Sequence, residues 1–279
     1  MKKSSRGRRS HESAANLDAM PFYHGVREAL GQQGCPLCRL LARDADRYLD
    51  AVLWELVNDP GVRSELNQAR GYCPQHGWML VRAGAAVGIA ILMRDVVQTL
   101  LDVLPANPVD DHSGSKLRGV LRRLDSDDVP EFMRSQDKAQ GPKRTLKLVQ
   151  ALSPQAPCPV CARLEPREKD YVRTLVAHLE EPGGLAEAYR DSDGLCLSHF
   201  RLALASAPST GAAQALVAAQ QSVWERLHRD LGEFIRKNDQ RFRDEPFGEE
   251  RDAWRRALEA ISDPPPRSES GRGGLTQSV

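Results

Sequence analysis

The sequence predicts an all-α protein of two tandem, related helical bundles, each clipped by a metal site of three cysteines and one histidine, plus a C-terminal helical strap. Three observations predict this fold class. Apolar residues recur at helical spacing, and no segment keeps the period-two alternation of a strand. A spacing of three cysteines occurs twice and accounts for all six cysteines. A segment rich in turn formers and charges separates the two occurrences.

The cysteines reveal an internal copy. The second three each follow the first three by 123 residues (158 − 35 = 123), and no cysteine lies outside this pattern. The same offset relates further pairs, which are His76 and His199, Pro36 and Pro159, Gly71 and Gly194, and Tyr48 and Tyr171. A match at one register over this many positions indicates a tandem duplication.

Changes in amino-acid composition along the chain predict six segments. We expect a disordered basic tail over 1–20, a first helical unit over 21–104 and a linker with one short helix over 105–142. A second helical unit over 143–238, a strap over 239–261 and a disordered tail over 262–279 follow. The linker helix is expected where Leu117, Val120, Leu121 and Leu124 keep helical spacing.

The first unit is expected to hold four helices. Leu41, Ala45, Tyr48, Val52 and Leu56 make an apolar stripe that predicts a helix over 36–58. Asp59 and Pro60 have the order of an N-cap and a first helical residue, which predicts a second helix to about residue 70. A third helix is expected after Cys73. Gly84 and Gly88 interrupt it or let it pack closely on a neighbour, and a fourth helix runs to about residue 104.

The second unit is expected to repeat this order over 159–179, 182–190, 197–204 and 211–238. The last of these helices carries a stripe that includes Leu216, Val223 and Leu227. A further helix over 249–261 belongs to the strap. Within the strap, Phe242, Phe247 and Trp254 are expected to pack on the bundles.

The repeated spacing has the ligand types of a zinc site. Zinc favours four tetrahedral ligands and accepts thiolate sulfur and imidazole nitrogen. The candidate ligands are Cys35, Cys38, Cys73 and His76 in the first copy, and Cys158, Cys161, Cys196 and His199 in the second. Each pair is expected at a helix start, where the partial positive charge of the helix favours thiolates. The sequence therefore predicts two zinc ions.

Four other interpretations compete with zinc. Buried structural thiols do not account for a duplicated set of four ligands. A thioredoxin-like redox centre needs a strand before its Cys-Pro-x-Cys motif, and it leaves Cys73 and His76 without a role. Iron–sulfur ligation is compatible with the cysteines but is the less favoured metal centre. Covalent haem attachment needs a histidine directly after the second cysteine, where this chain has Arg39 and Ala162.

The spacing leaves open which cysteines share an ion. Each copy can close its own site, or Cys35 and Cys38 can pair with Cys196 and His199 in a swapped arrangement. Local closure costs less loop entropy, so we expect each copy to hold its own ion.

Charge and hydropathy bear on compartment and partners. The 39 basic and 38 acidic side chains give a net charge of +1, so nucleic acid is a disfavoured partner. No apolar stretch follows the basic N-terminus, and no run reaches the ~20 residues of a membrane span. A cytoplasmic location is expected, where thiols stay reduced.

The duplicated motifs resemble an uncharacterised bacterial family, a domain of unknown function with repeated Cys-Pro-x-Cys and Cys-x-x-His units. The resemblance covers about residues 22–261 and implies no activity. We therefore expect a zinc-binding helical scaffold with a binding or regulatory role, open to an unknown protein partner. No catalytic constellation is evident, which argues against an enzyme. The alternatives are a zinc-thiolate redox switch and a DNA-associated regulator that uses the basic N-terminal tail.

Overall fold

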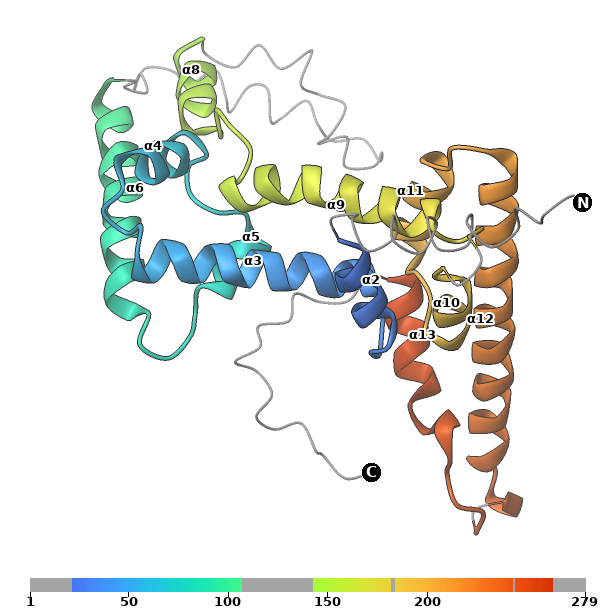
Figure 1. The fold of residues 1–279 in the computed structure, drawn as a ribbon. Coiled ribbons are helices and arrows are strands. Elements are labelled where there is room, and N and C mark those ends of the chain that lie inside the picture. Colours follow the sequence, from blue (N-terminus) through green and yellow to red (C-terminus); the bar gives the residue numbers. More distant parts are fainter. Residues whose placement is uncertain (1–21, 107–142, 182–183, 243, 263–279) are drawn as a thin grey trace, which may run out of the picture. The chain divides into compact units, whose positions relative to one another are not determined.

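The all-α prediction is confirmed by a computed structural model that describes residues 22–106, 143–181, 184–242 and 244–262 (Figure 1). Every regular element in these ranges is helical. The α-helices of the first half are α2 (Tyr23–Leu30), α3 (Pro36–Trp54), α4 (Pro60–Gln68), α5 (Pro74–Met79), α6 (Ala86–Ala106) and α8 (Lys143–Leu152). The second half holds α9 (Pro159–Ala177), α10 (Ala186–Asp191), α11 (Leu197–Ala205), α12 (Thr210–Lys237) and α13 (Ala253–Ile261), with 3-10 turns η3 (Gln240–Phe242) and η4 (Glu249–Asp252).

The chain forms two compact units that each take residues from both sequence copies. Unit 1 holds residues 1–49 and 160–279, and unit 2 holds residues 50–159. Because of this division, α3 and α9 each begin in one unit and end in the other. The basic tail, the linker helix around Leu117 and the C-terminal tail beyond residue 262 lie outside the described residues.

Unit 1 has one continuous apolar core. Tyr23 and Val26 of α2, which the sequence analysis did not predict as a helix, pack in the same buried cluster as Leu175 of α9 and Leu216 of α12. Tyr189 of α10 is fully buried in this cluster. The core therefore joins helices from the first copy to helices from the second.

The strap forms part of unit 1 and lies along α12 and α11. Ala253 and Ala260 face inward, and Arg256 binds Asp230 of α12 at 3.0 Å. The ring of Phe247 lies 5.6 Å from that of Phe234 in α12. Trp254 was expected to pack here as well, but it is half exposed. Ala253 and Ala260 occupy the inner face of α13, so Trp254 is left on the outer face.

In unit 2, helices α4 and α8 both pack against α6. Asp59 caps α4 as predicted, since its Oδ1 accepts from the Val62 N–H at 2.8 Å. Helix α5 ends at Met79, and Gly84 adopts a φ of 80° in the turn between α5 and α6. Gly88 lies inside α6, and a Cβ there would come within 3.3 Å of the Leu53 carbonyl oxygen. Gly84 thus lies in a turn between two helices, and Gly88 permits close packing.

The described helices include none that combines the length and apolar character needed to cross a membrane.

Candidate metal centres

Both Cys-x-x-Cys pairs and both Cys-x-x-His pairs lie at helix N-termini, as the sequence predicts. Cys35 and Cys158 directly precede α3 and α9, and each is followed by a proline that begins the helix. Cys73 and Cys196 are the N-caps of α5 and α11, with almost the same backbone angles, φ −63° and ψ 162° against φ −65° and ψ 162°. The two Cys-x-x-His turns thus share one local geometry.

The first cluster (the Cys35 cluster) joins Cys35, Cys38, Cys196 and His199, all within unit 1. Their ligand atoms lie within 4.8 Å of one another. The Nδ1 atom of His199 is 3.1 Å from Cys196 Sγ, 3.3 Å from Cys38 Sγ and 3.5 Å from Cys35 Sγ. Cys38 and Cys196 bring their sulfurs to 3.7 Å. The four atoms therefore surround one point.

The second cluster (the Cys73 cluster) joins Cys73, His76, Cys158 and Cys161. The Nδ1 atom of His76 is 3.2 Å from Cys73 Sγ and 3.7 Å from Cys158 Sγ. His76 is buried, whereas Cys161 is the one exposed cysteine of the six. Solvent therefore reaches this cluster more readily than the Cys35 cluster, in which Cys35, Cys196 and His199 are buried.

The expectation that each copy closes its own site is wrong, because both clusters combine the Cys-x-x-Cys of one copy with the Cys-x-x-His of the other. Loop entropy depends on the number of residues, but a helix in the loop also fixes the distance between its ends. A 19-residue helix begins at the proline of each Cys-Pro-x-Cys motif. At 1.5 Å per residue it carries the chain about 28 Å away from its start. The Cys-x-x-His of the same copy comes after that helix, and the Cys-x-x-His of the other copy fills the place at its start.

The Cys35 cluster has a carboxylate behind its histidine. Glu168 of α9 places Oε1 3.1 Å from Nε2 of His199, the ring nitrogen that faces away from the sulfurs. A carboxylate in this position fixes the tautomer with the proton on Nε2, which leaves Nδ1 free to bind a metal.

A buried amide holds the turn that presents Cys196. Gln220 of α12 is fully buried, and its Oε1 accepts from the Leu195 N–H at 3.0 Å while its Nε2 donates to the Leu195 carbonyl at 3.3 Å. The Tyr189 hydroxyl donates to the same Oε1. Burial raises the pKa of Tyr189, so the phenol stays protonated and remains a donor. The backbone before Cys196 is therefore fixed from two helices.

Two thiols of the Cys35 cluster have pKa values that shift in opposite directions. Burial works to raise the pKa of Cys35, but hydrogen bonds from the Cys196 and Cys38 thiols hold it well below its usual value. The pKa of Cys38 is raised by hydrogen bonds with Cys196 and Cys35 and by burial. One thiolate is thus stabilised at the expense of its neighbours, and a divalent cation at the centre would stabilise all three.

The spacing of these atoms fits a single tetrahedral ion. Zn–S bonds of about 2.3 Å and Zn–N bonds of about 2.0–2.1 Å place neighbouring ligand atoms roughly 3.6–3.8 Å apart in a tetrahedron. The measured separations of 3.1–3.7 Å in the Cys35 cluster lie at or slightly below this range. Both clusters could bind a metal ion through these residues.

Comparison with known proteins identifies a family. A model of a family of unknown function (DUF6062) matches residues 17–267. The chain belongs to this family. It is also 22% identical over 236 residues to an uncharacterized 23.9 kDa protein in the xynA 3' region of Caldicellulosiruptor sp. (strain Rt8B.4), a match that covers 84% of this chain and 98% of that protein. No solved structure matches.

Two residues of this DUF6062 site escaped the sequence analysis. Gln220 had a signal, since it falls between Leu216 and Val223 in the predicted stripe of α12, and a polar residue on an apolar face calls for a buried partner. No sequence signal marked Glu168, because the side of α9 that is turned toward His199 depends on tertiary packing.

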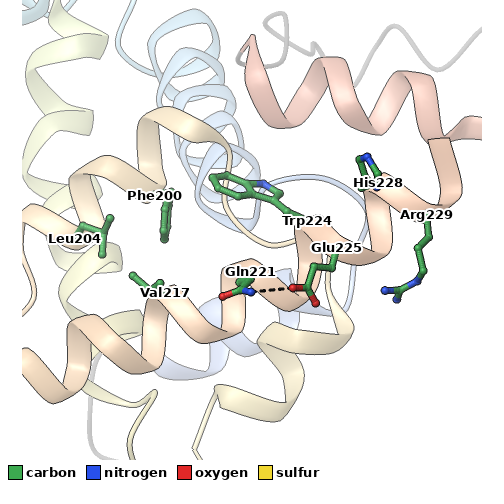
Figure 2. Close-up of a pocket in the computed structure, with 8 residues that line it drawn as sticks. All are labelled: Phe200, Leu204, Val217, Gln221, Trp224, Glu225, His228 and Arg229. Carbon is green, nitrogen blue, oxygen red and sulfur yellow. Dashed lines mark hydrogen bonds between the residues drawn. The ribbon is translucent and has the colours of Figure 1, made fainter. Parts of the chain in front are cut away.

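A hollow between α11 and α12 was also not predicted (Figure 2). It has a volume of about 680 Å³, and Phe200 and Trp224 form part of its wall with ring centroids 5.3 Å apart. Gln221, which lies near Trp224, binds Glu225 at 2.8 Å. The polar side chains His228 and Arg229 lie at the end away from Leu204 (Figure 2). The remaining lining residue is Val217. An apolar wall with a polar end is typical of sites for amphipathic ligands or side chains.

Proposed function

We propose that this chain is a zinc-binding helical scaffold with a binding or regulatory role, in which two zinc ions hold the duplicated halves together. The observation that carries the proposal is the crossed, four-ligand composition of both clusters. Three thiolates and one imidazole fill the coordination sphere that zinc favours in structural sites. A site filled by protein ligands leaves no open position for a substrate or an activated water.

The proposed ions would act as cross-links between segments distant in sequence. In the Cys35 cluster an ion would tie the start of α3 to the start of α11 across 157 intervening residues (196 − 38 − 1 = 157). A cross-link of this kind removes loop entropy from the unfolded chain, and zinc binding then contributes directly to folding free energy. In this proposal zinc acts as a structural element in a thiol-reducing, cytoplasmic environment.

Metal analysis of the purified full chain tests the proposal. We expect about two tightly bound zinc ions per chain, one for each four-ligand set. A content below about one zinc per chain, with the protein folded, would contradict it. Iron in place of zinc, with an absorption band from a cluster, would favour the less favoured iron–sulfur interpretation.

The exposed position of Cys161 favours one second candidate, a zinc-thiolate redox switch. In that reaction hydrogen peroxide takes two electrons from the Cys158 and Cys161 thiolates. With two protons it is reduced to two molecules of water, a disulfide forms, and zinc is released. Peroxide titration with a zinc-responsive dye should then release about one zinc per chain first, with the Cys158–Cys161 disulfide found by mass spectrometry. Zinc retained under mild oxidant would exclude the switch and leave the scaffold proposal standing.

A further inference from the structure

Helix α6 has one face that packs inside unit 2 and another that remains exposed. Leu92 and Val96 of the inner face are buried, and Asp95 binds Arg63 and Asn67 of α4. The outer face is apolar although it meets solvent. Val87 is 71% exposed, and the later residues of this face are about half exposed. Exposed apolar surface of this extent on one helix indicates an interaction site.

The exposed positions of α6 keep the spacing of a helix-pairing surface. The α6 stripe consists of Val87, Ala90, Arg94, Val97, Leu101 and Leu104, all exposed. Successive members are separated by 3, 4, 3, 4 and 3 residues, as are the a and d positions of a heptad. The stripe spans 18 residues, or about 27 Å at 1.5 Å per residue.

The α6 stripe is complementary to itself when two copies run antiparallel. Val87 then faces Leu104, Ala90 faces Leu101 and Arg94 faces Val97 of the other copy. In the outer two of these layers the smaller side chain meets a larger one, which fills space without overpacking. Because the same residues serve on both sides, the contact closes on a two-fold axis and adds no further copies.

We propose that the α6 stripe is a self-association surface, on which a second copy of this chain packs its own α6 in antiparallel orientation. Specific interfaces bury about 800 Å² per partner, more than one helical stripe alone supplies. Helix α8, which packs on α6, also exposes Leu146, Val149 and Leu152. In this proposal these side chains supply the rest of the contact area.

Arg94 limits the strength of this pairing. It is the one charged member of the α6 stripe, and the two-fold axis brings both copies of it next to the central layers. Its aliphatic stem can cover Val97 of the other copy while the guanidinium stays in water. Two cations near one axis repel each other, so the dimer should dissociate in the micromolar range.

Sedimentation equilibrium of the full, metal-loaded chain, from low to high micromolar concentration, tests the proposal. We expect a monomer–dimer equilibrium. Leu101→Glu should weaken it at least about tenfold, because it places a carboxylate against apolar Ala90 in two layers. Arg94→Leu should strengthen it about tenfold by removing the repulsion and adding apolar contact. Leu258→Glu on α13 is the matched control, since Leu258 is 57% exposed and Leu101 is 51% exposed. Circular dichroism checks that each variant is folded.

A charge pair tests the antiparallel register itself. Ala90→Lys combined with Leu101→Glu places opposite charges in both symmetry-related Ala90–Leu101 layers and should restore most of the dimer that Leu101→Glu loses. In a parallel pair each introduced charge would face the identical charge of the other copy, and the double variant would stay monomeric. A monomer at all concentrations would overturn the proposal and indicate that another part of the chain covers α6. A dimer insensitive to Leu101→Glu would overturn it too.

Discussion

Single side chains behind the cysteines decide how firmly each ligand is held. His199 is fixed from both sides, because the sulfurs face Nδ1 and the Glu168 carboxylate faces Nε2. For a metal ion at this cluster, the carboxylate would make the imidazole a stronger ligand, and it would keep the ring from rotating. Glu168 thus acts as a positioning residue for the Cys35 cluster.

Replacing Glu168 by glutamine should weaken the binding of one of the two proposed metal ions. The substitution keeps the shape of the side chain and removes its charge, so metal affinity at the Cys35 cluster should fall about tenfold or more. Competition with a zinc chelator should show one ion released more easily and the other unchanged. Glu165→Gln is the control, since Glu165 lies on the same helix and pairs with Lys169 at the surface. Equal retention in both variants would show that Glu168 does not support the ligand.

Gln220→Leu should destabilise the protein through the turn before Cys196. Leucine fills a similar volume but leaves the Leu195 carbonyl without its side-chain donor. The Leu195 N–H and the Tyr189 hydroxyl each lose the Gln220 oxygen and keep only their contact with each other at 3.3 Å. An unsatisfied buried group costs about 1–3 kcal/mol, so we expect a loss of about 2 kcal/mol in the free energy of unfolding. Urea denaturation of the zinc-loaded protein measures it. Gln221→Leu, one residue along α12 on its exposed side, should cost little.

At the scale of elements, helices α3 and α9 contact each other through different interactions at two positions related by the 123-residue offset. The Tyr171 hydroxyl of α9 donates to Asp44 Oδ2 of α3 at 2.6 Å. Tyr48 of α3, its counterpart at the 123-residue offset, has a buried hydroxyl without a hydrogen-bond partner among the described residues. The arginine Arg163 instead lies over the Tyr48 ring at 4.6 Å. The duplication therefore supplies a matched pair of tyrosines in different environments.

Tyr171→Phe should destabilise unit 1, whereas Tyr48→Phe should be neutral or slightly stabilising. A hydrogen bond to a charged group contributes about 1.5–3 kcal/mol. Burial and the bond to Asp44 raise the pKa of Tyr171 to about 12. Because this pKa lies above the unfolded value of about 10, the contribution is present below pH 10 and is lost as the pH rises through 12. Measuring the free energy of unfolding of both variants at neutral and at high pH tests whether Tyr171→Phe loses more stability than Tyr48→Phe. Equal losses for the two would contradict it.

Most helices could be predicted because their causes are local. Asp59, Pro60 and Pro74 mark helix starts through cap and ring geometry, and the stripe of α12 gives its buried face. The ligand residues followed from the repeated spacing. The facing of Glu168, the exposure of Trp254 and the hollow beside Trp224 depend on how whole helices pack, which no local pattern specifies.

At the scale of the whole molecule, the crossed clusters make each half of the sequence depend on the other. Each copy contributes one Cys-x-x-Cys and one Cys-x-x-His, but neither copy alone supplies the four ligand atoms that meet in a cluster. The sequence showed both pairings and could not choose between them, because the choice follows from where two long helices carry the chain.

Two double variants with the same number of altered cysteines distinguish the pairings. Cys35→Ser with Cys196→Ser removes two ligands from one cluster, so the chain should keep about one zinc. Cys35→Ser with Cys73→Ser removes one ligand from each cluster, so both clusters should bind zinc more weakly. The chain should then be less stable than the first variant. Local closure predicts the reverse order. Zinc content after dialysis against a mild chelator, together with thermal unfolding, separates the outcomes, because the two variants differ only in whether the altered cysteines share an ion.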